Sequence, residues 1–268
     1  MGMRFHKMHG LGNDFVVIDG RAAVVTLNTA QIRAIADRHT GIGCDQLILL
    51  EPSTVADAKM RIFNPDGGEV EACGNATRCV TRLIGADARI ETLGGILHGM
   101  SVGEGATIDM GQPRFDWDQL PLAYAMDTRD MPVNWDELER PAAVNVGNPH
   151  VIFFVPDAYA VPLVTLGPRI ETDPLFPERI NVNVATVTGP DAITLRVWER
   201  GAGITLACGT GACATAVAAI RRGLVAGPVT VTLPGGELEI DWRPGENIRM
   251  TGAATHVFTG ELDAGWLA

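Results

Sequence analysis

The sequence is short of basic residues, and of lysine above all. Its 268 residues hold 21 Lys and Arg against 32 Asp and Glu, which gives a formal net charge of −11 at pH 7. A surface of that sign repels nucleic acid, and no cluster of Lys or Arg offsets it locally, so we expect no nucleic-acid partner. The two lysines, Lys7 and Lys59, lie outside any motif. Pyridoxal phosphate needs a Schiff-base lysine, so this cofactor is disfavoured.

Long apolar runs are also missing. The longest, such as residues 151–155, have the length of a strand, far below the roughly 20 residues of a membrane span. The first seven residues carry no apolar stretch behind their basic side chains and no small-residue cleavage site, so no signal peptide is visible. We therefore expect a cytoplasmic protein without a membrane partner.

The sequence has five cysteines, an odd number, and none of them stands in a Cys-x-x-Cys motif. This usage fits reduced thiols better than a disulfide framework. Paired histidines at metal-ligand spacing are absent as well, so we expect no metal site. Cys44, Cys79 and Cys213 are interpreted as inert core residues, the usual role of a lone cysteine in an apolar segment.

The other two cysteines share a motif. Cys73-Gly74-Asn75 and Cys208-Gly209-Thr210 each follow an alanine and are 135 positions apart. The same offset, applied without gaps, aligns further pairs: Gly12-Asn13 with Gly147-Asn148, Gln46 with Asn181, Arg61-Ile62-Phe63 with Arg196-Val197-Trp198, Asn64 with Glu199, and Gly68 with Gly203. The chain therefore reads as two copies of one unit.

Short β-branched runs bounded by Gly, Pro or Asp recur at 15–18, 46–50, 60–63, 151–154, 193–197 and 229–233, and helical periodicity occurs at 29–38, 73–84 and 208–222. The last helix is small and apolar on nearly all faces, which predicts a central helix wrapped by mostly antiparallel strands. The prediction is an α/β (α+β) fold with an N-terminal half at 1–116, completed by 255–268, and a C-terminal half at 117–254. Residues 115–141 are interpreted as the crossover.

A cysteine at the start of each helix has a chemical use. Free backbone N–H groups at a helix start stabilise an anion, so we expect a lowered thiol pKa and a binding site for a ligand carboxylate. A site between the two copies would place two thiols opposite each other across one ligand. Two facing acid/base groups are what inversion of a stereocentre requires.

The other polar candidates for the site can also be explained by common structural roles. Asn13, Asn64, Asn148 and Asn181 could be turn residues, the common use of Asn beside Gly or Pro. Their register with the cysteines favours a shared pocket. His150 is equally well explained as a hydrogen-bonded structural histidine, and Glu199-Arg200 could be a solvated pair at a strand end.

Seven ordered segments resemble the diaminopimelate epimerase family over essentially the whole chain. They are Met8-His9-Gly10-Leu11-Gly12-Asn13-Asp14-Phe15, Gly41-Ile42-Gly43-Cys44-Asp45-Gln46, Arg61-Ile62-Phe63-Asn64, Glu71-Ala72-Cys73-Gly74-Asn75, Gly147-Asn148-Pro149-His150, Asn181-Val182-Asn183 with Trp198-Glu199-Arg200-Gly201, and Ala207-Cys208-Gly209-Thr210-Gly211.

The resemblance implies a cofactor-independent epimerase that interconverts LL- and meso-diaminopimelate in bacterial lysine and peptidoglycan-precursor synthesis. It also implies two similar barrel-like halves with the active site in the cleft between them. Cys73 would be the proton donor and Cys208 the acceptor for the LL substrate. Glu199 would hold an ammonium group and His150 would lie near the reacting centre, and both are counted with the catalytic residues.

The remaining site residues follow from the same resemblance. Gly74-Asn75 and Gly209-Thr210 would hold the reacting carboxylate through backbone N–H groups. The side chains that would bind the two amino-acid ends of the substrate are Asn13, Gln46, Asn64, Asn148, Asn181 and Arg200. The family forms homodimers, and Phe258 is the candidate interface residue.

Three rival interpretations stay open. The first is a two-thiol enzyme for another substrate, such as a proline or hydroxyproline racemase. The second is a redox protein in which Cys73 and Cys208 cycle through a disulfide, although neither is in a Cys-x-x-Cys motif. The third is a protein that binds the ligand without chemistry, which the presence of both cysteines disfavours.

Overall fold

The chain divides into two compact units in a computed structural model that describes residues 2–71, 73–85, 87–263 and 265–266. Unit 1 comprises Met1–Ile108 and Gly252–Ala268, and unit 2 comprises Asp109–Thr251. The sequence prediction placed these borders at 116/117 and 254/255. The chain passes from one unit to the other within strands β8 (Gly105–Asp109) and β18 (Arg249–Ala253).

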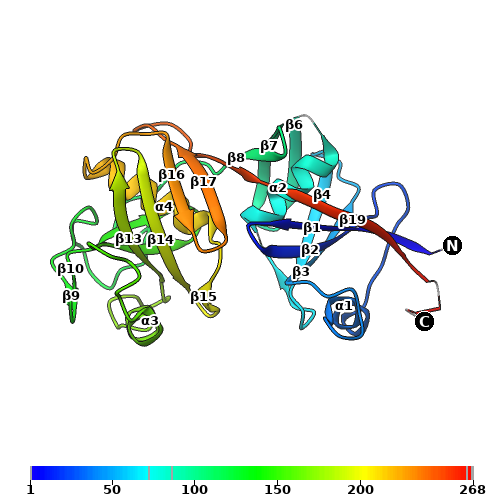
Figure 1. The fold of residues 1–268 in the computed structure, drawn as a ribbon, viewed down its shortest axis with the longest axis horizontal. Coiled ribbons are helices and arrows are strands. Elements are labelled where there is room, and N and C mark those ends of the chain that lie inside the picture. The colour runs from blue at the N-terminus through cyan, green and yellow to red at the C-terminus, as the bar shows by residue number, and fades with distance from the viewer. Residues whose placement is uncertain (1, 72, 86, 264, 267–268) are drawn as a thin grey trace. The chain divides into compact units, whose positions relative to one another are not determined.

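Unit 1 is a curved sheet around one helix. Its other elements are β1 (Met3–Gly10), β2 (Asn13–Asp19), α1 (Thr29–Ala36), β3 (Gln46–Glu51), β4 (Ala58–Phe63), β5 (Glu69–Val70), α2 (Gly74–Ile84), β6 (Asp87–Thr92), β7 (Gly95–Val102) and β19 (Thr255–Leu262). Strand β1 pairs antiparallel with β2 and β19, so the C-terminal strand completes this unit. Helix α2 contacts β1, β2, β6 and β7, and Figure 1 shows it among these strands.

Unit 2 repeats this plan. Its elements are β9 (Asn134–Trp135), β10 (Leu138–Glu139), β11 (Ala142–Asn145), β12 (Pro149–Phe154), α3 (Leu163–Glu171), β13 (Asn181–Gly189), β14 (Ala192–Glu199), β15 (Gly203–Thr205), α4 (Gly209–Arg221), β16 (Val229–Leu233) and β17 (Gly236–Asp241). Helix α4 contacts β11, β12, β13, β14, β16 and β17. In Figure 1 it lies inside their sheet.

The 135-residue repeat is visible in the strand registers. Strands β2 and β3 are parallel with Phe15 opposite Gln46, and β12 and β13 are parallel with His150 opposite Asn181. The next pairs also match, because Leu47 lies opposite Phe63 and Val182 lies opposite Trp198, both antiparallel. The repeat is therefore structural as well as chemical, and it places the start of α2 and of α4 at equivalent points of the two units.

Continuous apolar runs mark the strands that are covered on both faces. Along β2, Phe15 and Val17 pack in the cluster around α2, while Val16 and Ile18 pack with Ile32 and its neighbours on α1. Side chains alternate between the two faces of a strand, so a strand buried on both faces needs an unbroken apolar sequence. Helix α4 is buried from Gly209 to Ala219 except at Thr210, as its small apolar sequence predicted.

The predicted strands and three predicted helices are confirmed, with two differences. Helix α3 was not predicted, because Gly167 and Pro168 interrupt its pattern. Residues 115–141 are more than a crossover segment, since Leu120, Met131 and Leu138 are buried in the core of unit 2.

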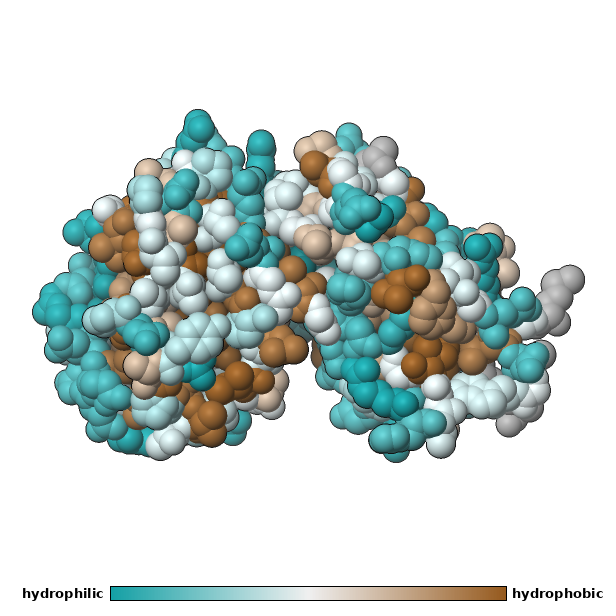
Figure 2. All heavy atoms as spheres, viewed as in Figure 1, coloured by the Kyte–Doolittle hydropathy of each residue, from teal (hydrophilic) through white to brown (hydrophobic). Residues whose placement is uncertain are grey.

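Hydrophilic and hydrophobic residues are intermixed over the visible face of each unit (Figure 2). None of the helices in the described part of the chain has the length and apolar character of a membrane span.

Candidate active site

The first half-site lies in unit 1 at the start of α2. Cys73 is the N-cap residue with extended backbone (φ −148°, ψ 110°), and the helix begins at Gly74. The Thr77 N–H donates to the Cys73 carbonyl over 2.9 Å, which leaves the N–H groups of the first helical positions without intrahelical acceptors. The Cys73 side chain is partly exposed. Ala72, which precedes it in the motif, lies outside the described residues.

Two asparagines surround the Cys73 thiol. Cys73 Sγ donates to Asn13 Oδ1 at 3.8 Å, and Asn75 Nδ2 donates to the same oxygen at 3.1 Å. Asn13 stands at the start of β2 and Asn75 in the first turn of α2, so the β1–β2 turn and the helix start meet here. The thiol hydrogen therefore points to an amide oxygen, a contact that favours the protonated form of the thiol.

A second pair of amides lies in the same unit. Gln46 Nε2 donates to Asn64 Oδ1 at 3.1 Å, joining the start of β3 to the end of β4. Gln46 Oε1 is buried and accepts no hydrogen bond from the residues that the structure describes. An unsatisfied buried oxygen costs about 1–3 kcal/mol, and an incoming N–H donor removes that cost. Gln46 therefore offers an acceptor for an ammonium group.

The second half-site lies in unit 2 at the start of α4. Cys208 is the N-cap residue, and its sulfur accepts the Gly211 N–H at 3.4 Å and contacts Thr210 Oγ1 at 3.5 Å. Cys208 is buried, unlike Cys73. The sulfur of Cys208 therefore receives a hydrogen bond from its own helix.

A partly buried carboxyl group, that of Glu199, adjoins Cys208. Glu199 Oε1 accepts the Thr205 hydroxyl at 2.6 Å. Burial raises the pKa of Glu199, and its interactions with the Thr205 hydroxyl and the Cys208 thiol only partly oppose this rise. Burial first, and then the Glu199 charge, raise the pKa of Cys208 well above its usual value. The expectation of a lowered thiol pKa at the helix start is therefore wrong for Cys208, because desolvation outweighs the N–H donors in this state.

His150 is a fully buried member of this half-site. Its Nδ1 lies 3.1 Å from Asn183 Oδ1, and its Nε2 lies 3.1 Å from Thr210 Oγ1 and 3.2 Å from Asn148 Oδ1. Asn183 Nδ2 donates to Gly211 O and to a threonine of α4, so its oxygen faces His150 and Nδ1 carries the proton. His150 is a satisfied histidine that also reaches the Cys208 site through Thr210. Burial lowers the pKa of His150 to about 4.

The low pKa of His150 predicts a pH-dependent stability. An unfolded histidine has a pKa of about 6.5, so the unfolded chain binds a proton that the folded chain rejects. The free energy of unfolding should fall as the pH drops below about 6.5, by about 2 kcal/mol between pH 7 and pH 5. Urea unfolding at the two pH values measures this difference. A His150→Gln variant that shows the same loss would contradict the assignment.

Two of the predicted substrate-binding residues, Asn181 and Arg200, form hydrogen bonds within unit 2. Asn181 Nδ2 donates to the Pro149 carbonyl at 2.9 Å, and its Oδ1 accepts the Arg200 N–H at 2.9 Å. The Arg200 guanidinium is exposed and donates to the Glu178 carbonyl at 3.0 Å. Asn181 thus fixes the strand end that carries Glu199 and Arg200.

Comparison with known proteins identifies the family. The diaminopimelate epimerase family matches residues 5–115 and 142–257. A diaminopimelate epimerase of Rhizorhabdus wittichii is 71% identical over 98% of this chain and 96% of its own length. One of Sphingopyxis alaskensis is 70% identical over 98% of both. The chain belongs to the diaminopimelate epimerase family.

Solved structures share the fold of this family member at low identity. A PhzF-family phenazine biosynthesis protein of Bacillus anthracis is 17% identical, with a TM-score of 0.69 over 98% of this chain and 99% of its own. A hydroxyproline epimerase of Agrobacterium vitis is 16% identical, with a TM-score of 0.64 over 97% and 90%. These likenesses concern the fold alone.

The structure brings the predicted residues of this family member together in two groups. In unit 1 the group consists of Cys73, Gly74, Asn75 and Asn13, and Gln46 is hydrogen-bonded to Asn64. In unit 2 the group consists of Cys208, Gly209, Thr210, Glu199, His150 and Asn148, and Asn181 is hydrogen-bonded to Arg200. Asn183, Thr205 and Asp45 also contact these groups, and the sequence interpretation assigned them no role. Asn183 and Asp45 lie inside the motifs quoted above, and this position in a motif was the sequence signal that could have marked them as site residues.

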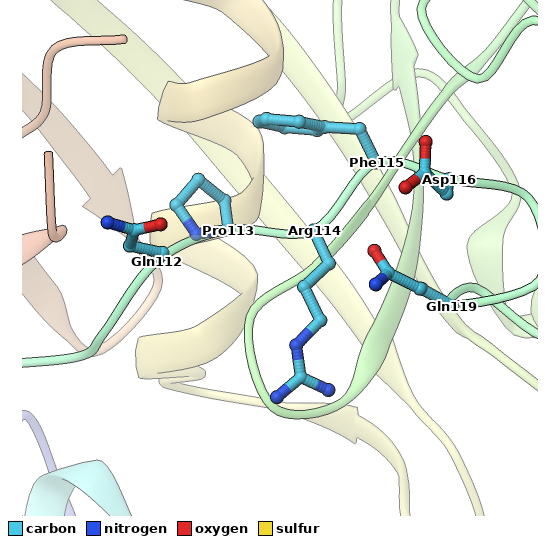
Figure 3. A pocket seen from close by; sticks show the side chains of 6 residues that line it. All are labelled: Gln112, Pro113, Arg114, Phe115, Asp116 and Gln119. Carbon is cyan, nitrogen blue, oxygen red and sulfur yellow. The ribbon is translucent and has the colours of Figure 1, made fainter. Parts of the chain in front are cut away.

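One surface hollow, of about 480 Å³, lies elsewhere in unit 2. Its lining is Gln112, Pro113, Arg114, Phe115, Asp116 and Gln119, and Figure 3 shows these side chains along one loop. None of them is a predicted site residue. Phe115 lies under the Arg221 guanidinium, 3.8 Å from the ring centroid. Among the described residues, no group of three or more His, Cys, Asp or Glu side chains could hold a metal ion.

Proposed function

We propose that this chain is a cofactor-independent epimerase that interconverts LL- and meso-2,6-diaminopimelate, with Cys73 and Cys208 as the acid and the base. The observation that carries the proposal is the different setting of the two thiols. Cys73 donates its hydrogen to a neutral amide oxygen, Asn13 Oδ1, while the Cys208 sulfur accepts a helix N–H and lies beside the Glu199 carboxyl group. Cys73 is therefore assigned as the acid, and Cys208 as the base once its proton has passed to Glu199.

For the LL substrate, Cys208 is the acceptor. Its thiol transfers a proton to Glu199, and the resulting thiolate takes the α-proton of the substrate. Cys73 then gives its proton to the opposite face of the same carbon, and the reverse reaction exchanges the roles. Cys208 and Glu199 influence each other's titration, so their apparent pKa values belong to the pair.

The N-terminal ends of α2 and α4 stabilise the transition state electrostatically. Removal of the α-proton builds negative charge on the adjacent carboxylate, and the N–H groups of Gly74, Asn75, Gly209 and Thr210 are the donors for that charge. Donors aimed at developing charge stabilise the transition state more than the ground state. His150 holds the Thr210 hydroxyl at 3.1 Å and so keeps this corner of the site fixed.

The remaining polar residues select a substrate with two amino-acid ends. Gln46 Oε1 is an open acceptor for an ammonium group, and Arg200 has an exposed guanidinium for the distal carboxylate. Asn13, Asn64, Asn148 and Asn181 complete the set, and Glu199 also faces the reacting ammonium. An amino acid with one end would leave the distal groups unpaired, at a cost of several kcal/mol. A homodimer through Phe258, which is 48% exposed and packs on Phe5, and a cytoplasmic location stay predictions.

Proton NMR in D₂O tests the substrate. Reduced protein without added cofactor is expected to exchange the α-proton of LL-diaminopimelate and to form the meso isomer. Proline and hydroxyproline are the comparison substrates in parallel tubes. Exchange with proline or hydroxyproline but not with diaminopimelate would refute the substrate assignment, and no exchange with any of the three would refute the epimerase proposal.

A further inference from the structure

A chain of four side chains runs past the Cys73 thiol in unit 1. Asn13 Nδ2 donates to Asp45 Oδ2 at 3.1 Å, and Asn13 Oδ1 accepts Asn75 Nδ2 at 3.1 Å. Asn75 Oδ1 in turn accepts Arg78 Nη2 at 2.9 Å. Two amides therefore lie head to tail between a carboxylate and a guanidinium. The Cys73 thiol donates to the oxygen at the middle of this chain, Asn13 Oδ1.

The two ends fix the direction of the chain. An ionised carboxylate only accepts hydrogen bonds and a guanidinium only donates them, so neither amide can turn over without losing a charged partner. An asparagine without such neighbours can exchange its oxygen and nitrogen at little cost. With the ends in place, Asn13 must present its oxygen, and not its N–H, to Cys73.

Both ends are themselves held in place. Asp45 Oδ1 accepts Arg38 Nη2 at 2.6 Å, and its Oδ2 also accepts the Asp14 N–H at 3.1 Å. Arg38 also bonds Asp14, which is further bonded by Lys7. Burial would raise the pKa of Asp14, but the hydrogen bonds from Arg38 and Lys7 lower it to about 2, so Asp14 stays ionised at neutral pH.

Arg78 is fixed by burial. Its side chain is fully buried, and Nε donates to the Ala253 carbonyl at 3.3 Å. Gly10 makes room for the guanidinium, because a Cβ atom there would lie 3.0 Å from Arg78 Nη2. The guanidinium is therefore held beside Asn75 at the start of α2.

We infer that Asp45 and Arg78 are positioning residues that set the direction of the Asn13–Asn75 amide chain and thereby keep Cys73 in its protonated form. The inference rests on the proposed role of Cys73 as the acid for the LL substrate. An N–H in place of the Asn13 oxygen would stabilise the thiolate and remove the proton that the acid must deliver. Among the described residues, the charged groups linked to this amide chain by printed contacts are Lys7, Asp14, Arg38, Asp45 and Arg78.

The pH dependence of Cys73 alkylation by iodoacetamide tests the inference without substrate. A Cys208→Ala background leaves Cys73 as the partly exposed cysteine, since Cys44, Cys79 and Cys213 are buried. The decisive variant is the double change Asp45→Asn with Arg78→Met, which removes one negative and one positive charge. We expect the thiol pKa of Cys73 to fall by about one unit, with alkylation at pH 7 about tenfold faster.

The matched control is Lys7→Gln with Asp14→Asn, a second pair of opposite charges in the same cluster that leaves both ends of the amide chain intact. Its Cys73 pKa should stay within about 0.3 unit of the parent. A double variant at 45 and 78 that keeps the parental pKa, or raises it, overturns the inference. Thermal unfolding checks that each variant is folded.

If Arg78→Met prevents folding, two single substitutions test the inference instead. Asp45→Asn and Asp14→Asn each remove one carboxylate, but only the first frees the Asn13 amide. A larger fall in the Cys73 pKa for Asp45→Asn supports positioning, and equal falls for the two variants show a plain charge effect and refute it. Absence of substrate exchange with the wild-type protein would refute the proposed function alone, because the alkylation profile does not depend on it.

Discussion

Replacing Cys73 or Cys208 with alanine is expected to lower kcat for diaminopimelate epimerisation by about 10³-fold or more. Each thiol does proton transfer on one face of the carbon, and general acid–base catalysis by one group contributes about 10²–10⁴. Loss of either group stops inversion, since the remaining thiol reaches one face only. A spectrophotometric or NMR assay of meso formation from the LL isomer measures the effect.

Each helix supplies its own control cysteine. Cys79 lies in α2 and Cys213 in α4, and both are fully buried core residues. Cys79→Ala and Cys213→Ala remove a buried sulfur from the same helix while leaving the N-cap thiol in place, so kcat should change less than about threefold. If the N-cap variants retain activity comparable to these controls, the thiols are not the acid and base.

The second large effect is expected for Glu199→Gln. The glutamine cannot accept the Cys208 proton, so kcat should fall by about 10²–10³-fold. The thiol pKa of Cys208 should fall at the same time, because the Glu199 charge raises that pKa. A more acidic thiol with a slower reaction is the signature of a lost proton acceptor.

Thiolate absorbance near 240 nm, followed against pH in a Cys73→Ala background, reads the Cys208 pKa directly. Glu237→Gln is the control, since Glu237 lies on β17 and bonds only Thr232 among the described hydrogen bonds. The control should change neither the kcat nor the Cys208 titration. A Glu199→Gln enzyme with parental kcat would remove Glu199 from the proton path.

The sequence was most informative where chemistry repeats. The offset of 135 between Cys73 and Cys208 predicted the two units and the helix starts, and the strand registers follow it from β2 to β5 and from β12 to β15. Local pattern also sufficed for the strands and for α1, α2 and α4, because their apolar periodicity is strong. Helix α3 was not predicted because Pro168 and Gly167 weaken its helical periodicity, whereas burial of Leu166 and Ile170 stabilises it in the fold.

The parts of the site that the sequence could not give depend on contacts between distant residues. Asp45 reaches Asn13 across 32 positions and Asn183 reaches His150 across 33, so neither contact follows from local spacing. The pKa of Cys208 was misjudged for a related reason. Position at a helix start can be read from sequence, whereas the depth of burial that raises the pKa comes from the surrounding sheet.

The deuterium content of substrate and product at low conversion tests the two-thiol mechanism most directly. Wild-type protein in D₂O would act on unlabelled LL-diaminopimelate, and mass spectrometry would follow both isomers over the first few per cent of reaction. The account predicts a meso product with one deuterium at the inverted carbon and a remaining LL pool with almost none, because the proton is removed by one thiol and replaced from the other. A meso product that retains the original protium would show one group serving both faces and would contradict the account.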